Sequence, residues 1–241
     1  MLHVRGLTVA FGGQPVLEAI DFDVGTGEFT SLIGPSGSGK TSILRAVSAL
    51  LRPQSGTVAL DVPLNDVGFL FQDDALLPWR TVRQNITLGL RIRGFAPKAA
   101  VEKAEHWLSL LGLEGFGDRY PRQLSGGQRK RVAMAQVLVL EPRLLLMDEP
   151  FASLDAIVRM RITEELLSWV EREHMTVLLV THDLEEAISA SDVIYVLSQG
   201  PQATIRARHQ IGIARPRRVL ETRRDPLFAP LMQLLWEELS E

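Results

Sequence analysis

The chain has 241 residues, of which 46% are hydrophobic and 23% charged, the composition of an ordinary globular protein. Its net charge of -3 provides no overall basic field for nucleic acid, and the absence of cysteine excludes disulfides and thiolate metal sites. No apolar run approaches the roughly 18 residues of a membrane helix, and Met1–Gly6 shows no signal-peptide core. We therefore expect a cytoplasmic protein that binds no nucleic acid and meets a membrane only through a partner.

The N-terminal region predicts a β-hairpin. Residues 2–10 and 16–24 alternate between apolar and polar side chains, and Gly12 and Gly13 form a turn between them. Phe11 lies at the tip of this hairpin. Its ring is either a core aromatic beside the turn or a platform that stacks on a nucleotide base, and its position alone leaves both interpretations open.

A phosphate loop follows. Residues 29–33 predict a buried strand, apolar residues recur at helical spacing from Ile43, and the pattern G-x-x-x-x-G-K-[ST] lies between them. Glycines let the backbone curl around an anion, and a helix N-terminus adds partial positive charge. Lys40 would bind the β- and γ-phosphates, and the Thr41 hydroxyl would bind Mg²⁺. The predicted phosphate-binding residues are Gly34, Pro35, Ser36, Gly37, Ser38, Gly39, Lys40, Thr41 and Ser42.

Two strands and a helical region come next. Residues 57–60 and 67–71 predict strands, and the second strand ends at Gln72. Leu76–Trp79 is an apolar cluster in a loop, which we expect to be exposed. Residues 81–113 are mainly helical in pattern and separate two α/β portions, so we expect a helical subdomain, about 81–135, inserted in the core.

Leu124–Gln128 has the sequence Leu-Ser-Gly-Gly-Gln and opens another helix. A Ser-Gly-Gly turn at a helix N-terminus predicts a second anion-binding end. No Lys-Thr pair follows it, so this turn carries no Mg²⁺ ligand of its own.

Two apolar strands then end in polar residues. Residues 144–147 are fully apolar and lead into Asp148 and Glu149, and residues 176–180 lead to His182. Such runs are typical of central parallel strands, and α/β sheets bind ligands at the carboxyl ends of their strands. A last strand is predicted at 193–197.

The C-terminal extension, 199–241, gives a weaker signal. We expect its basic run to be a solvated surface, with contact to lipid head groups or a partner as the alternative; this run comprises Arg206, Arg208, Arg215, Arg217, Arg218, Arg223 and Arg224. Pro226 opens an amphipathic helix with a stripe of Leu227, Leu231, Leu234, Leu235 and Leu239. We expect this stripe to pack on the chain's own core, with a docking face as the alternative.

Taken together, the phosphate loop, the Leu124–Gln128 turn and the Asp148-Glu149 pair resemble the nucleotide-binding subunit of ATP-binding-cassette (ABC) transporters, from about residue 2 to about 198. Leu124–Gln128 is the most specific of these motifs. The resemblance implies an α/β fold: a phosphate-loop NTPase core with an N-terminal antiparallel β portion and the inserted helical subdomain. A phosphate-loop kinase explains neither Leu124–Gln128 nor His182.

The resemblance also implies roles for the site residues in an ATPase that uses ATP and Mg²⁺. Phe11 matches the aromatic that stacks on adenine, and Gln72 matches the lid glutamine that reaches Mg²⁺ and the attacking water. Asp148 would hold Mg²⁺, Glu149 would polarise the water, and His182 would contact the γ-phosphate. The opposing subunit of a head-to-tail homodimer would contribute Ser125, Gly126, Gly127 and Gln128, and the loop Ser153-Leu154-Asp155 would cross between subunits.

Phe71–Trp79 is similar to the lid of bacterial importers for nitrate, sulfonates and taurine. This implies a peripheral protein on the cytoplasmic face of the inner membrane, with a separate solute-binding protein and a permease that docks near Leu76–Trp79. An exporter ATPase and a soluble ABC ATPase that acts as a scaffold are the alternatives. Two residues depart from the family pattern, since Lys130 stands where Gln is usual and Gln136 where Arg is common. Both lie outside the phosphate-contacting turn, so we expect no effect on activity.

Overall fold

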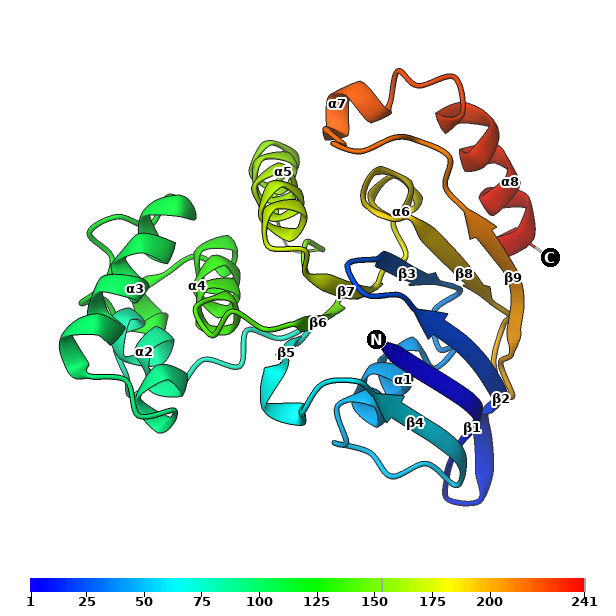
Figure 1. Ribbon diagram of the computed structural model, residues 1–241, viewed down its shortest axis with the longest axis horizontal. Helices are drawn as coiled ribbons and strands as arrows, with labels where there is room; N and C mark the ends of the chain where they lie inside the picture. Colours follow the sequence, from blue (N-terminus) through cyan, green and yellow to red (C-terminus); the bar gives the residue numbers. More distant parts are fainter. Residues whose placement is uncertain (153, 241) are drawn as a thin grey trace.

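The computed structural model describes residues 1–152 and 154–240. They form two β-sheets with flanking helices, and a separate group of helices extends from one edge of the larger sheet (Figure 1). Within these residues, no helix combines the length and the apolar character needed to cross a membrane.

The smaller sheet is antiparallel and contains the predicted hairpin. β1 (Leu2–Phe11) pairs with β2 (Gln14–Val24), which confirms the hairpin, and β4 (Ser55–Leu60) adds to the other side of β1. Gly56 has a φ of +91°, and a Cβ there would overlap the backbone of Gly6. Glycine is therefore required where β4 meets β1.

The larger sheet has the strand order β5-β6-β7-β3-β8-β9 and is parallel except for β9. Both faces of its central strands are covered, which explains their continuous apolar runs. Its strands are β3 (Phe29–Ile33), β5 (Val67–Leu70), β6 (Leu144–Asp148), β7 (Thr176–Val180), β8 (Val193–Leu197) and β9 (Ile205–Gln210).

Side chains of the central strands alternate between two hydrophobic clusters. Leu145 and Leu179 pack with α5 (Ala156–Arg172), whereas Leu146 and Leu178 pack with α1 (Lys40–Val47) and the smaller sheet. Figure 1 shows α1 between the two sheets, with α5 and α6 (Leu184–Ala190) on the opposite face. This packing fixes the strand ends that carry the predicted site.

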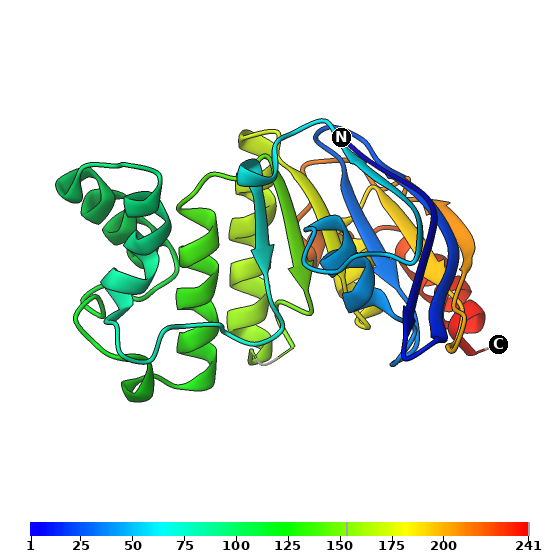
Figure 2. The ribbon, with the colours of Figure 1, turned by 90° about the horizontal axis from the view of Figure 1, so that it is seen from below.

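The predicted helical region forms α2 (Val82–Ile92), α3 (Pro97–Leu110) and α4 (Gly126–Leu138). A capping box between Thr81 and Gln84 begins α2. Figure 2 shows these helices at one end of the molecule, beyond β5 and β6. The subdomain boundary at about 81–135 and the division at residue 198 remain predictions. Short 3₁₀ helices occur at Leu64–Asp66 and Pro121–Gln123.

The basic C-terminal run is only partly the solvated surface that we expected. Arg206 and Arg208 are exposed, but they lie on β9, a strand that the sequence analysis missed. The side chain of Arg217 is buried and pairs with Asp192 at 3.0 Å, and Arg215 pairs with the same carboxylate. For Arg217 the prediction was wrong, because Asp192 compensates its charge inside the fold, whereas Arg215 is exposed at the surface.

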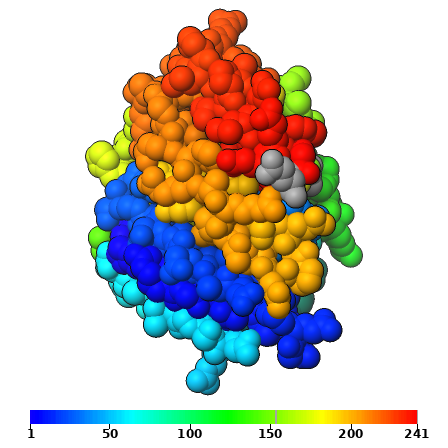
Figure 3. All heavy atoms as spheres, turned by 90° about the vertical axis from the view of Figure 1, so that its right-hand side faces the viewer, coloured from blue at the N-terminus to red at the C-terminus, as the bar shows by residue number. Residues whose placement is uncertain are grey.

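The C-terminal helices cover the edge of the larger sheet. α7 (Val219–Thr222) is short, and α8 (Phe228–Ser240) packs against α6 and β8. Leu231, Leu235 and Leu239 lie in this contact, as predicted for the stripe, whereas Leu227 and Leu234 are exposed. Figure 3 shows α8, in red, on the outer surface beside β9.

Candidate nucleotide-binding site

The sheet order brings the predicted catalytic residues to one edge. β5, β6, β7 and β3 are parallel neighbours, and a predicted site segment follows each of them. Gln72 follows β5, Glu149 follows β6, His182 follows β7, and the loop 34–41 follows β3. Carboxyl ends of parallel strands meet at one edge of a sheet, which is where such folds bind ligands.

The loop at 34–41 wraps around the amino group of Lys40. The Lys40 Nζ atom donates to the carbonyl oxygens of Gly34 at 2.7 Å and Pro35 at 2.8 Å. Burial lowers the pKa of Lys40, and the nearby Glu149 and Asp148 carboxylates oppose this shift. Gly39 caps α1 with a φ of +86°, and a Cβ there would lie 2.7 Å from Leu17 Cδ2. The loop therefore has little room for any residue other than glycine at this point.

Thr41 and Asp148 lie together beside this loop. The Thr41 hydroxyl donates to Asp148 Oδ1 at 3.1 Å. Burial raises the pKa of Asp148, and the hydrogen bond from Thr41 opposes this shift. In the part of the chain that the structure describes, no three His, Asp or Glu side chains gather as a metal cluster. One carboxylate and one hydroxyl fit Mg²⁺, which usually takes few protein ligands and completes its shell with phosphate oxygens and water.

Glu149 is contacted by two of the other predicted catalytic residues. Its Oε1 atom lies 3.1 Å from His182 Nδ1, and its Oε2 atom accepts from Gln72 Nε2 at 3.5 Å. The backbone of Glu149 has a φ of +45°, a conformation that is uncommon for residues other than glycine. Its N–H donates to the carbonyl of Val180 at 2.9 Å, which ties the turn to β7.

The second anion-binding end lies elsewhere in the chain. Ser125 caps α4 through a capping box with Gln128, in which each side chain accepts from the other residue's backbone N–H. Figure 1 shows α4 within the helical group, apart from α1. The structure therefore does not bring this turn to the phosphate loop within one chain. Leu154 lies beside the turn, because a Cβ at Gly127 would be 3.4 Å from it. Ser153 lies outside the described residues.

The aromatic side chains of Phe11 and Trp79 are both exposed. Phe11 is 51% exposed, so its interpretation as a core aromatic was wrong, while stacking on a base stays a prediction. Trp79 is 71% exposed, but Leu76 in the same cluster is buried. The predicted apolar surface at 76–79 is therefore formed mainly by the indole of Trp79.

Sequence reasoning missed the contacts between α4 and the segment after β5. Lys130 is buried and donates to two carbonyls of this segment, and Arg129 pairs with Asp74 at 2.7 Å. Burial lowers the pKa of Lys130, and the Asp148 and Asp74 carboxylates oppose this shift. The only signal in the sequence was the departure from the family pattern at residue 130.

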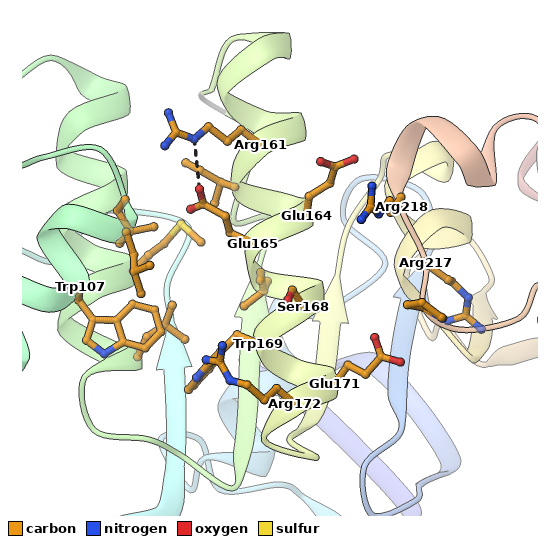
Figure 4. Close-up of a pocket in the computed structure, with 17 residues that line it drawn as sticks. Trp107, Arg161, Glu164, Glu165, Ser168, Trp169, Glu171, Arg172, Arg217 and Arg218 are labelled. Atoms are coloured by element: carbon orange, nitrogen blue, oxygen red, sulfur yellow. Dashed lines mark hydrogen bonds and ion pairs between the residues drawn. The ribbon is translucent and has the colours of Figure 1, made fainter.

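A large cavity lies away from these residues. It has a volume of about 570 Å³ and lies between α5, the helical group and residues 216–218 (Figure 4). Trp107 and Trp169 line it and meet edge to face, with ring centroids 5.1 Å apart. None of the predicted site residues lines this cavity, so it is not the predicted nucleotide site.

Residues 17–152 match the ABC transporter family. The chain belongs to this family. Among curated relatives, an aliphatic sulfonates import ATP-binding protein of Rhizobium johnstonii is 47% identical, over 83% of this chain and 78% of the relative. A relative of the same kind from Pseudomonas savastanoi is 40% identical, over 100% of this chain and 97% of its own length. A sulfate/thiosulfate import ATP-binding protein of Synechocystis is 43% identical over 82% of this chain, which spans 58% of that relative.

Solved structures agree with this assignment. The dimeric structure of the bacterial ABC transporter cassette MJ0796 superposes with a TM-score of 0.81 at 29% identity, and covers 89% of this chain and 100% of its own. A second structure of that cassette, bound to ADP and phosphate, gives a TM-score of 0.80. The predicted family and fold class are confirmed, and the chain is an ABC ATPase.

Proposed function

We propose that this ABC ATPase powers a bacterial importer of a small solute such as a sulfonate. It would act at the cytoplasmic face of the inner membrane, on a permease that receives its solute from a separate solute-binding protein. The observation that carries the proposal is the position of Glu149, which lies between Gln72 and His182 at the sheet edge that also holds the phosphate loop. Relatives named as sulfonate and sulfate import proteins support the solute class.

The residues at this edge suit hydrolysis of the γ-phosphate. Glu149 would accept a proton from the attacking water, and the Gln72 amide would orient that water. Lys40 would exchange its carbonyl partners for phosphate oxygens, and His182 would donate to the γ-phosphate. Thr41 and Asp148 would hold Mg²⁺, with Gln72 close by, and the bound ion would supply neutralisation of the phosphate charge. Catalysis of this kind depends on positioning and charge compensation, which these strand ends can provide.

A homodimer would complete the site. Within one chain the Ser125–Gln128 turn stays apart from the phosphate loop, and its helix N-terminus would accept an anion from outside the chain. In a head-to-tail pair, this turn would bind the γ-phosphate held by the partner subunit. The MJ0796 cassette, which has the same fold, is itself a dimer.

The exposed indole of Trp79 is the proposed contact with the permease. A scaffold protein would not need an apolar side chain at the surface of the lid, so Trp79 distinguishes import from that alternative. The test is affinity purification of the chain from detergent-solubilised native membranes, followed by mass spectrometry. We expect a polytopic membrane protein in about equal amount, and its loss with Trp79→Ala. Recovery with soluble partners only, in both forms, would contradict the importer proposal and leave the ATPase chemistry intact.

A further inference from the structure

The segment between β5 and α2, residues 71–81, is called the lid segment here. It carries Gln72 at one end and Trp79 towards the other. The side chain of Gln72 reaches Glu149 on the core at 3.5 Å, but other contacts of the segment lead to the helical group. What holds the lid segment therefore decides whether Gln72 reaches its catalytic position.

Two neighbouring residues of α4 hold the near end of the lid segment. The Lys130 Nζ atom donates to the carbonyl oxygens of Phe71 at 2.6 Å and Gln72 at 2.7 Å. Arg129 Nε donates to Asp74 Oδ2 at 2.7 Å. At the far end, the buried side chain of Asn85 on α2 bonds both the N–H and the C=O of Leu77.

Of the two α4 residues that hold the lid segment, Lys130 is the buried one. Only 3% of its surface is exposed, and a buried ammonium group is costly unless its protons are bonded. Two short charge-assisted bonds to adjacent carbonyls meet that need. They also fix the position and direction of the main chain at Gln72 relative to α4. A neutral side chain without a donor would leave both carbonyls without this partner.

We infer that Lys130 is a positioning residue, which fixes the main chain of the lid segment on α4 and so holds Gln72 beside Glu149. The inference rests on the proposed function, since it gives Lys130 a part in ATP hydrolysis. It differs from the expectation that Lys130, which stands where the family usually has Gln, has no effect on activity. It also joins the Ser125–Gln128 turn, at the start of the same helix, to the glutamine of the chain's own site.

The test compares Lys130→Met with a matched control, Arg131→Met. Arg131 lies on the same helix and donates to the carbonyl of Leu111 at 2.9 Å, away from the lid segment. We expect Lys130→Met to lower kcat about tenfold while the KM for ATP stays within about twofold, because the phosphate loop is built on β3 and α1. Lys130→Gln keeps an amide donor and should lie between Lys130→Met and wild type.

A double-mutant cycle shows whether Lys130 acts through Gln72. In a Gln72→Ala background, Lys130→Met should lower kcat by less than about twofold, because residues that act through one another are not additive. The same tenfold loss in both backgrounds would overturn the inference. So would a kcat for Lys130→Met equal to that of Arg131→Met.

Hydrogen exchange of the lid segment tests the contact without using activity. Amides of residues 71–77 should exchange faster in Lys130→Met than in Arg131→Met, since local opening is limited by such bonds. Equal exchange in the two variants would overturn the inference. A wild-type protein that hydrolyses no ATP would instead contradict the proposed function. The exchange measurement would still report on the contact between Lys130 and the lid segment.

Discussion

Glu186 on α6 is a half-buried acid that is bonded to Thr181, the residue before His182. Its Oε2 atom accepts from the Thr181 hydroxyl at 2.5 Å, while its Oε1 atom is buried without a hydrogen-bond partner. Burial raises the pKa of Glu186 from 4.5 to about 8, and the bond from Thr181 opposes this shift. At neutral pH the folded protein therefore holds a protonated carboxyl group at this position.

The raised pKa makes stability depend on pH with a definite sign. Below about pH 4.5, Glu186 is protonated in both the folded and the unfolded state, so it contributes no pH dependence. Between about pH 4.5 and 8 the unfolded state binds fewer protons than the folded state, so the free energy of unfolding falls as pH rises. At 1.36 kcal/mol for each pKa unit, the raised pKa corresponds to a loss of about 5 kcal/mol across this interval.

The variant Glu186→Gln removes this titration. At pH 5 we expect it to be less stable than wild type by about 1–2 kcal/mol, because its amide adds a buried donor near Oε1. At pH 9 the order should reverse, and the variant should be more stable by about 3 kcal/mol. Urea unfolding of both proteins at intervals from pH 5 to 9 measures the difference, with Glu185→Gln as the control for loss of an exposed carboxyl from the same helix. A difference between Glu186→Gln and wild type that does not change with pH would refute the reasoning.

Three further changes probe the site and its support. Gly39→Ala should weaken ATP binding at least about tenfold, because its Cβ would lie 2.7 Å from Leu17 Cδ2 at a φ of +86°; titration with a fluorescent ATP analogue tests this, and unchanged affinity would contradict it. Leu235→Ala should lower the free energy of unfolding by about 2–4 kcal/mol, because the fully buried Leu235 joins α8 to the core, and it should leave the KM for ATP unchanged. Urea unfolding and steady-state kinetics test this, and an unchanged free energy of unfolding or an altered KM would contradict it. Asp192→Asn should cost about 3 kcal/mol in urea unfolding, because it leaves the buried guanidinium of Arg217 without a counter-charge, and a cost below about 1 kcal/mol would indicate that the pair is not needed.

Local patterns in the sequence were sufficient where one element determines the outcome. The glycine loop before Lys40 and the apolar runs that end at Asp148 and Val180 depend on short-range chemistry and on burial of both strand faces. Parallel strands place their carboxyl ends at one edge of a sheet. The sequence alone was therefore sufficient to predict that Gln72, Glu149 and His182 lie close together.

Contacts between distant segments could not be predicted in this way. The pairing of β9 with β8 was missed because its alternating arginines suggested a solvated surface, although Ala207 and His209 on the same strand are partly buried. Arg217 pairs with Asp192, and Lys130 donates to the carbonyls of Phe71 and Gln72, only after the fold has brought these segments together. No periodicity in the sequence encodes such pairs, because the partners lie 25 and 58 or more residues apart.

Glu149→Gln tests the central claim, that Glu149 is the general base of an ATPase that works as a dimer. The amide keeps the size of the side chain and can still contact His182 and Gln72, but it cannot accept a proton from water. We predict that ATP turnover falls by roughly 10²–10⁴-fold while ATP still binds, and that light scattering of the variant with ATP shows a stable dimer. Turnover near that of wild type, with no additional dimer in the presence of ATP, would contradict the account.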